Sequence, residues 1–408
     1  MPVVSRRHFK VLWAAGAVFF IALMVTHPRA VFEGASAGVQ TWWNIVLPAL
    51  LPFFIASELL MSFGVVHFMG VLLQPVMRPL FNVPGPGSFV VAVGFTSGYP
   101  IGAMLTSKLR SRGMLSRVEA ERLVSFTNNS SPLFMLVAVA VGMFNMPSLG
   151  YLIAGSHYLG NLTMGLLLRF YRYRDSFHIS GTPWRGNLIV AACGEMARVM
   201  KAEQRPLSQI VSDAVKNSVT NLLNIGGFII LFAVIIKLLD SLGFINFLAS
   251  VMAAVLVPLG FAPETMAALA TGLFEMTLGT RAAAESTAPL LQQLTAVAMI
   301  LAWSGLSIQA QVAAMVSGTD IRLTPFVLTR ICHAGLASMY TILLFPLLNI
   351  HSKPVLSPEA AHTGNLFSHP FYFDYLQVSG SILLFFILAP LLLYFFTLAA
   401  AFVTGRRH

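Results

Sequence analysis

The sequence predicts an all-α, polytopic membrane protein of about 12 segments, and three observations carry this prediction. Of the 408 residues, 57% are hydrophobic and only 10% are charged, whereas a soluble domain carries about 25% charged residues. The mean hydropathy is +0.78. The apolar residues also gather in runs close to the ~20 residues that a membrane-spanning helix needs. Because so few charged residues could not cover a water-facing surface, we expect much of the surface to face lipid.

The first apolar run follows a basic start that contains Arg6, Arg7 and Lys10. A cleaved signal peptide and a retained anchor both begin in this way. No small-x-small cleavage site follows the run directly, and Pro28 comes soon after its end. We therefore predict a signal-anchor helix and an outer loop over residues 1–40, with the amino terminus in the cytoplasm.

Two blocks of five apolar segments make up most of the chain. Each segment is near the length of a spanning helix. The predicted division is a first repeat at 41–168, a basic cytoplasmic linker at 169–216, a second repeat at 217–350, an outer loop at 351–376, and a final transmembrane helix with a basic tail at 377–408.

The distribution of basic residues agrees with this topology. The loop 108–122, the linker and the carboxyl tail are rich in arginine and lysine, and all three fall on the cytoplasmic side. The loop near 350–376, which falls outside, has one lysine and no arginine. We therefore expect a multi-pass protein of the cell membrane with both termini in the cytoplasm.

The two blocks also resemble each other. Trp43–Leu47 and Thr220–Asn224 occupy corresponding places, and the glycine-broken third segments, at Gly94–Gly102 and Gly272–Gly279, keep nearly the same offset. Because the first block enters from outside and the second from inside, the repeats are expected to be inverted, as in many secondary transporters. The sequence therefore predicts inverted five-plus-five helix repeats with broken or re-entrant third segments.

The third segment of the first block carries polar residues at membrane depth. Its glycines and Pro100 should break the helix near Thr96 and Ser97. Non-helical backbone is tolerated there only where it is buried in protein or lines a cavity, and the start of the next half-helix offers amide donors to an oxygen of a solute. The alternative is a kink at which glycines pack against a crossing helix.

The fourth segments carry further polar residues, which we assign to substrate binding with Thr96 and Ser97. Four consecutive polar side chains point all round a helix, so some of them must face a neighbour or water. For the first block, the alternative is a capped helix start at the membrane surface. The candidate residues of the fourth segments are Asn128, Asn129, Ser130, Ser304 and Ser307.

Two carboxylates fall inside predicted spanning segments, namely Glu58 and Glu275. A carboxylate within the membrane points to function by default, because it binds a cation, carries a proton or accepts a hydrogen bond from a solute. For Glu58, a structural bond across a helix contact is an equal alternative. Glu275 is the stronger candidate for both substrate binding and coupling, because it lies between Gly272 and Gly279.

Other functions find little support. The net charge of +10 is explained by cytoplasmic loops, so no nucleic acid is expected. Cys193 and Cys332 lie far apart without a second thiol or histidine at metal-ligand spacing, so we expect no metal and no cofactor. No phosphate-binding G-x-x-x-x-G-K-[ST] loop occurs.

Enzyme signatures are equally weak. Gly34–Gly38 fits G-x-S-x-G but lacks the strand-to-helix setting that gives this motif its meaning. His157 and His333 lie in apolar segments without a nearby acid, as is typical of hydrogen-bonded core residues. We therefore expect that the chain is not an enzyme. An intramembrane hydrolase that uses Ser36 as its nucleophile is a distant alternative.

Three stretches, Leu47–Phe54, Gly94–Gly102 and Glu119–Leu123, resemble the YlbJ family of sporulation integral membrane proteins from endospore-forming bacteria. The resemblance covers about residues 40–350 and is more specific in the first block. That family is related to the nucleoside-recognition or gate-domain proteins. These include spore maturation proteins A and B, the membrane part of bacterial ferrous-iron transport protein B, and concentrative nucleoside transporters.

The resemblance implies a cell-membrane protein needed for spore formation, built from two gate-like repeats with a transporter-like fold. The elements that bind solute in the nucleoside transporters would correspond to Thr96, Ser97, Asn128, Asn129, Glu275 and Ser304. The residue pattern of those transporters is not intact at these positions.

We therefore expect the chain to move a small polar solute or nucleoside-like metabolite during spore formation. The alternative is a non-transporting scaffold for spore cortex or envelope assembly. The expected partners are the lipid bilayer, a small solute, and further copies of the chain or other sporulation membrane proteins.

Overall fold

The computed structural model describes residues 6–173 and 187–347, in which all regular secondary structure is helical. This confirms the all-α prediction for these residues. The predicted outer loop at 351–376 and the final segment at 377–408 lie outside the described residues. The α-helices are α1 Arg6–Thr26, α2 Pro28–Thr41, α3 Leu47–Ser62, α4 Val65–Val76, α5 Gly87–Ser97, α6 Ile101–Ser111, α7 Arg117–Thr127, α8 Leu149–Leu168, α9 Leu188–Ala202, α10 Leu207–Ser241, α11 Phe244–Leu256, α12 Met266–Phe274, α13 Met276–Ala284, α14 Leu290–Trp303, α15 Gly305–Val316 and α16 Thr324–Leu344.

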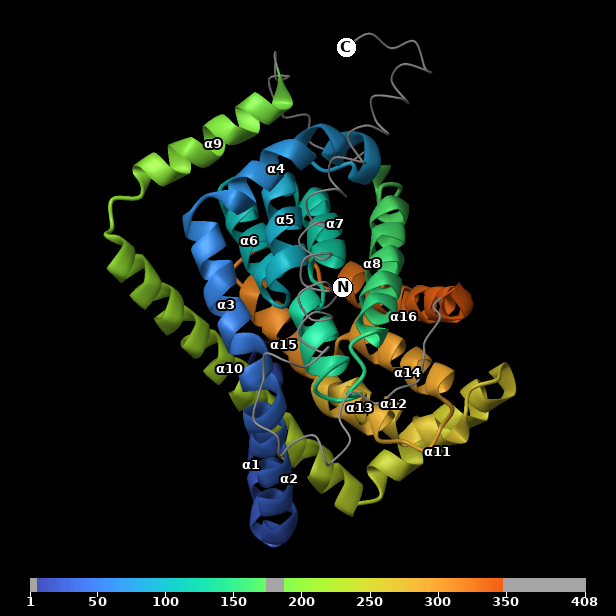
Figure 1. Cartoon of the computed structure of the whole chain (residues 1–408). Coiled ribbons are helices and arrows are strands. Elements are labelled where there is room, and N and C mark those ends of the chain that lie inside the picture. The colour runs from blue at the N-terminus through green and yellow to red at the C-terminus, as the bar shows by residue number, and fades with distance from the viewer. Residues whose placement is uncertain (1–5, 174–186, 348–408) are drawn as a thin grey trace, which may run out of the picture.

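Two halves of the chain repeat one order of elements. The first half runs from α3 and α4 through the pair α5–α6 to α7, a π-helix at Phe134–Val139, and α8. The second runs from α10 and α11 through the pair α12–α13 to α14, α15 and α16. The halves meet through α8 and α16, which pack against each other, and through α6 and α15. In Figure 1, α5–α7 lie above α13 and α14. The bounds of the two predicted blocks and their inverted relation stay predictions.

The third segment of each half is a helical hairpin. A Cβ atom at Gly94 would overlap the Thr127 carbonyl, and one at Gly102 would lie 2.6 Å from the same oxygen, so α5 and α6 turn back on each other against α7. In the second half, a Cβ at Gly279 would lie 2.6 Å from the backbone nitrogen of Gly272. Close approach of the helices therefore depends on these glycines, and the predicted breaks are confirmed.

The hairpins change the count of membrane spans. α5 and α6 have 11 residues each, which is about 16 Å of helix and half of the ~30 Å hydrocarbon core. In the described part of the chain, three helices are long and apolar enough to span, or up to five if two bent pairs count as one span each. The figure of about 12 segments is not confirmed, because an apolar run of spanning length can also be two short helices that turn back.

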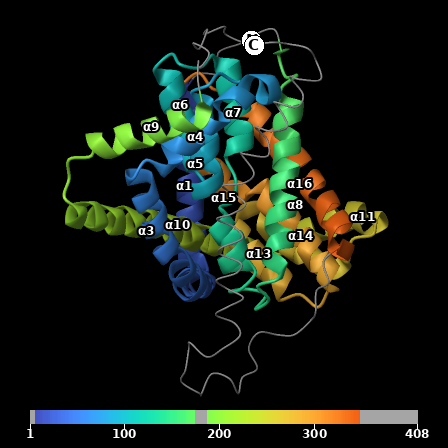
Figure 2. The same cartoon turned by 45° about the horizontal axis from the view of Figure 1, so that its top comes forward.

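The predicted linker contains two ordered helices. α9 packs on α4 through Leu72, Leu188 and Ala192. α10 then begins at Leu207 and continues for 35 residues without a break, across the predicted boundary at 216. Figure 2 shows α9 and α10 as an elbow at one side of the molecule. The sequence predicts a boundary at 216 because the first residues of α10 are polar and the later ones apolar. A single helix that extends out of the membrane shows the same change in composition.

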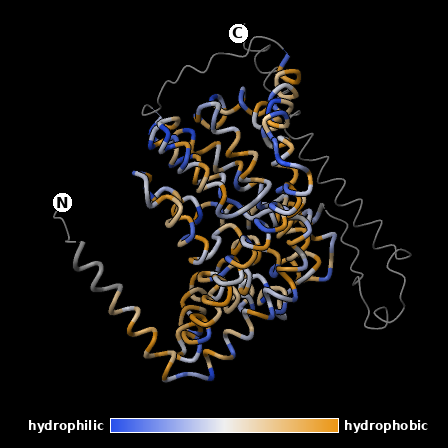
Figure 3. The backbone as a smooth tube through the Cα atoms, turned by 90° about the vertical axis from the view of Figure 1, so that its left-hand side faces the viewer, coloured by the Kyte–Doolittle hydropathy of each residue, from blue (hydrophilic) through white to orange (hydrophobic). Residues whose placement is uncertain are grey.

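Large apolar side chains remain exposed on the outer helices, as a lipid-facing surface requires. Val25 of α1 is 74% exposed, and Phe247 of α11 is 60% exposed. Figure 3 shows α1 extending away from the rest of the molecule. On α2, the stretch Gly34–Gly38 packs on α10, where a Cβ at either glycine would lie 2.9 Å from α10 backbone. This stretch is therefore a helix-packing surface.

Candidate functional site

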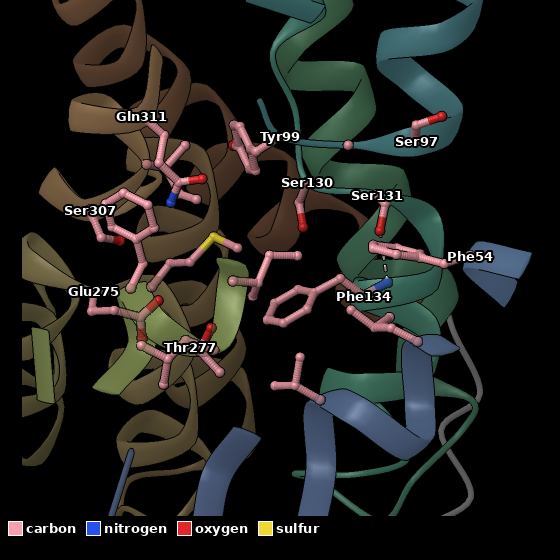
Figure 4. A pocket seen from close by; sticks show the side chains of 18 residues that line it. Phe54, Ser97, Tyr99, Ser130, Ser131, Phe134, Glu275, Thr277, Ser307 and Gln311 are labelled. Carbon is pink, nitrogen blue, oxygen red and sulfur yellow. Dashed lines mark hydrogen bonds between the residues drawn. The ribbon is translucent and has the colours of Figure 1, made fainter. Parts of the chain in front are cut away.

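A cavity lies between the two halves, at the tips of both hairpins (Figure 4). About 50 Å³ of it is open to the centre of a water-sized sphere. One wall is apolar and includes Val46, Phe54, Phe134 and Phe228. The polar lining consists of Ser97, Tyr99, Ser130, Ser131, Glu275, Thr277, Ser307 and Gln311. Four of the predicted substrate-binding residues, Ser97, Ser130, Glu275 and Ser307, therefore meet at one cavity.

The first hairpin supplies Ser97, the last residue of α5. Gly98 follows with a φ of 80° and packs so closely on Ser131 that a Cβ there would lie 2.9 Å from the Ser131 Cβ. The Ser97 Oγ and the Ser130 Oγ are both buried without a hydrogen-bond partner among the described residues. In Figure 4 the Ser130 side chain points toward the middle of the cavity. The Ser130 hydroxyl can donate a hydrogen bond to a solute there, whereas the Ser97 side chain points away from the middle of the cavity (Figure 4).

The polar stretch 128–131 is a break inside the protein. α7 ends at Thr127, and Ser131 begins the next helical piece by accepting a 3.1 Å hydrogen bond at Oγ from the Phe134 N–H. Ser131 is thus a helix cap, and all four residues of the stretch are buried. The depth of that cap in the membrane stays a prediction. Burial of four successive polar residues fits backbone that lines or supports a cavity.

Asn128 and Asn129 support the cavity from behind and do not line it. The Asn129 side-chain amide donates a 3.0 Å hydrogen bond to the Phe126 carbonyl at the end of α7. The Asn128 side chain is buried without a hydrogen-bond partner in the described part of the chain. The structure thus separates these two residues from Ser130, their neighbour in the chain.

Glu275 forms the tip of the second hairpin. Its extended backbone links α12 to α13, and its Oε2 accepts a 2.7 Å hydrogen bond from the Leu278 N–H. The side chain is 3% exposed and faces the cavity. The partial positive charge at the start of α13 stabilises its carboxylate. The position predicted between two glycines is therefore the turn of a buried hairpin.

The second broken helix contributes Ser307 from α15. Ser304 lies at the break itself with a φ of 71°, and its Oγ donates to the Trp303 carbonyl at 2.5 Å, away from the cavity. Gly305 packs against the hairpin tip, where a Cβ would lie 3.2 Å from the Glu275 Cα. In both halves, the tip of the hairpin therefore packs against the break in the fourth segment.

A second, smaller cavity adjoins the first and is lined by two further predicted residues. Glu58 and Thr96 line it, and it shares Phe54 and Ser97 with the main cavity. The Thr96 hydroxyl donates to the Ala92 carbonyl at 2.8 Å, while Glu58 accepts a long 3.4 Å bond from Asn217. Glu58 and Thr96 are therefore separated from Glu275 and belong to a lateral cavity.

Four helical pieces of the described chain begin at or next to the main cavity, namely α6, α13, α15 and the piece that Ser131 caps. Helix starts carry unpaired amide donors and a partial positive charge. Together with the serine hydroxyls, they favour solute groups that accept hydrogen bonds, such as a carbonyl, a carboxylate or a phosphate oxygen. Glu275 is the one carboxylate in the lining and favours a donor group at its end of the cavity.

Sequence reasoning missed a buried polar cluster behind Ser130. Arg330 of α16 is fully buried and contacts the α7 break, and Asn161 of α8 joins it there. Next to them, the Ser130 N–H donates to His157 Nε2 at 3.4 Å, and His333 Nε2 donates to the His157 carbonyl at 2.8 Å. The prediction that both histidines are hydrogen-bonded core residues is confirmed. A lone arginine in an apolar segment was the available signal for the cluster.

Away from the cavity, an ion pair ties the base of the first hairpin to the second half. Arg110 donates two 2.8 Å hydrogen bonds to Asp320 in the loop after α15. These bonds hold the pKa of the Asp320 carboxyl below its usual value. Both groups are partly exposed, so the pair contributes at most about 1 kcal/mol to stability.

Comparisons with known proteins agree with this architecture. The family model "Gate: Nucleoside recognition" matches residues 44–154 and 222–319, one block in each half. The sporulation integral membrane protein YlbJ of Bacillus subtilis is 45% identical over 337 residues, which cover 82% of both chains. An uncharacterized protein of Alkalihalophilus pseudofirmus is 30% identical over 134 residues, 32% of this chain and 29% of that one.

A solved structure of a doubly substituted CNTnw in an outward-facing state aligns with 83% of this chain and 88% of its own, with a TM-score of 0.43 and 12% identity. The two matched blocks place the chain among gate-domain proteins. More particularly, the chain belongs to the YlbJ family of sporulation integral membrane proteins.

Proposed function

We propose that this protein moves a small polar solute across the membrane during spore formation. The observation that carries the proposal is the single cavity at which Ser97, Ser130, Glu275 and Ser307 meet. Hairpin tips and broken helices from both halves form it. This arrangement suits alternating access, in which one half moves against the other around a fixed site.

The cavity limits the solute in this conformation. A water molecule needs roughly 10–15 Å³ of such volume, so about 50 Å³ accommodates a few waters or a solute of similar size. A nucleoside-like metabolite, which the name of the matching family model brings into consideration, would need the walls to move apart. A hydrogen-bond acceptor of the solute would face Ser130, and a donor would face Glu275.

We assign the coupling role to Glu275 ahead of Glu58. Glu275 is buried in the wall of the main cavity, where binding of a proton or of a cationic group would change the charge that the solute meets. Glu58 lies in the lateral cavity and is bonded to α10. A coupling role of Glu58 would require a proton or cation to pass between α3 and α10, away from the main cavity.

A matched pair of serine variants on α15 tests the proposal. Ser307 lines the cavity, while Ser317, near the end of the same helix, is exposed and bonded to the Ala314 carbonyl. We expect Ser307→Ala to reduce solute movement about tenfold, the effect of one lost hydrogen bond, and Ser317→Ala to leave it unchanged. The measurement is mass-spectrometric comparison of metabolites retained by vesicles with and without the protein.

The mixture offered to the vesicles should contain nucleosides, amino acids, carboxylates and phosphate esters. Equal solute pools in both kinds of vesicle, together with full sporulation by the Ser307→Ala strain, would contradict transport. That pair of results would favour the scaffold alternative, which predicts tolerance at the cavity and sensitivity at the surface loops.

A further inference from the structure

The end of α7 presents backbone carbonyls deep inside the protein, and each needs a partner. The last carbonyls of a helix receive no hydrogen bond from an N–H group of the same helix. Water to replace that donor is scarce at membrane depth. The Phe126 carbonyl accepts from the side chains of Asn129 and Asn161. The Ser130 carbonyl accepts from the Tyr158 hydroxyl at 3.0 Å. The Ser125 and Asn128 carbonyls both accept from Arg330.

Arg330 reaches these carbonyls from the other half of the chain. Its Nη1 donates to the Asn128 carbonyl at 3.0 Å, and its Nη2 donates to the Ser125 carbonyl and, at 3.2 Å, to Asn161 Oδ1. The guanidinium carbon lies 5.4 Å from the centre of the Phe326 ring. Arg330 is fully buried, and no carboxylate of the described residues pairs with it.

The partial negative charge of the α7 carbonyl end is therefore the main balance for this buried cation. A helix carboxyl end carries roughly half an elementary negative charge, and arginine stays protonated in proteins. The second break differs, because its Leu301 carbonyl accepts from the neutral hydroxyl of Tyr99 at 3.1 Å. Among the described residues, Arg330 thus bonds carbonyls of the first break directly, whereas the Leu301 carbonyl is bonded by a neutral hydroxyl.

We infer that Arg330 is a tethered cation, which holds the α7 break in the position that a mobile metal cation occupies in transporters with broken helices. In such proteins, the carbonyls of unwound segments and half-helix ends coordinate the coupling cation. Here the guanidinium already fills that coordination. The break is therefore closed to sodium and potassium, and Asn128–Ser131 keeps its shape without them.

Salt-dependent melting of the purified full chain tests this inference, and it needs no knowledge of the solute. Arg330→Lys keeps a tethered charge, whereas Arg330→Gln keeps donor groups without charge. Wild-type protein should melt at one temperature in sodium, potassium and choline chloride of equal ionic strength. Arg330→Gln should melt below Arg330→Lys, and sodium or millimolar guanidinium should raise its midpoint over choline by about 2–4 °C.

Trp303→Phe is the matched control, because it frees the Leu273 carbonyl at the end of α12, which accepts from Trp303 Nε1 at 3.1 Å, without removing a charge. It should show no cation dependence. A higher melting midpoint of the wild type in sodium than in choline would overturn the inference. So would an Arg330→Gln variant whose melting midpoint equals that of Arg330→Lys and does not change when cations are added. If Arg330→Gln yields no folded protein, sodium independence of the wild type together with a folded Arg330→Lys variant supports the inference. Because melting needs no transport, a failure here is distinct from a failure of the proposed function.

Discussion

Replacement of Gly94 by alanine is expected to prevent the first hairpin from closing against α7. The new Cβ would overlap the Thr127 carbonyl, which is backbone and has no rotamer by which to move away. Over-packing of this kind costs about 1–3 kcal/mol, and more where backbone must shift. Because Thr127 immediately precedes the Asn128–Ser131 break, displacement should also disturb the cavity. The measurement is the melting midpoint of detergent-purified protein, followed by size-exclusion chromatography.

Gly155→Ala provides the control for the glycine experiment. Gly155 lies inside α8, where a Cβ would meet no atom within 4 Å, so alanine should leave stability unchanged or raise it by up to about 1 kcal/mol. A Gly94→Ala protein that melts with the wild type would show that α5 does not approach α7 as described.

Replacement of Glu275 by glutamine is expected to abolish most of the function while the fold survives. The amide oxygen of glutamine can still accept the Leu278 N–H and cap α13, but the negative charge in the cavity is lost. Hydrogen bonds to charged groups contribute about 1.5–3 kcal/mol, so we expect a loss of about ten- to hundredfold. The measurement is the count of heat-resistant spores in a strain that lacks its own YlbJ-type gene, at matched protein levels in the membrane.

Two further variants separate charge from capping. Glu275→Ala should lose the function and also about 1 kcal/mol of stability, because the cap disappears. Glu285→Gln removes a carboxylate at the other end of α13, where it pairs with Arg281 at 2.7 Å outside the cavity, and should be tolerated. Normal spore counts with Glu275→Gln would remove Glu275 from the site.

The positions at which helices break could be predicted from the sequence. Whether the chain crosses the membrane or turns back at those positions could not. Glycine and proline at 94–102 and glycine on both sides of Glu275 identify backbone that leaves the helix, and both positions are hairpin turns in the structure. Hydropathy alone does not distinguish a run that crosses the bilayer from one that turns back. That difference depends on which helix the glycines contact, as Gly94 and Gly102 contact Thr127.

The site residues divide in the same way. Ser97, Ser130, Glu275 and Ser307 could be predicted because polar residues at membrane depth are costly and need a reason. Asn128, Asn129 and Ser304 do not line the cavity, and the sequence alone does not distinguish them from the polar residues that do. Arg330 contacts the α7 break from a helix about 200 positions further along the chain, so only the fold brings the two together.

Reactivity of single cysteines tests the existence of a water-accessible cavity between the two halves most directly. In a background without Cys193 and Cys332, Ser307→Cys should react with a small, charged, membrane-impermeant thiol reagent from at least one side of the membrane. Ser338→Cys, on a buried stretch of α16 outside the cavity, should not react. An unreactive Ser307→Cys from both sides, while an exposed Ser317→Cys reacts, would contradict the account.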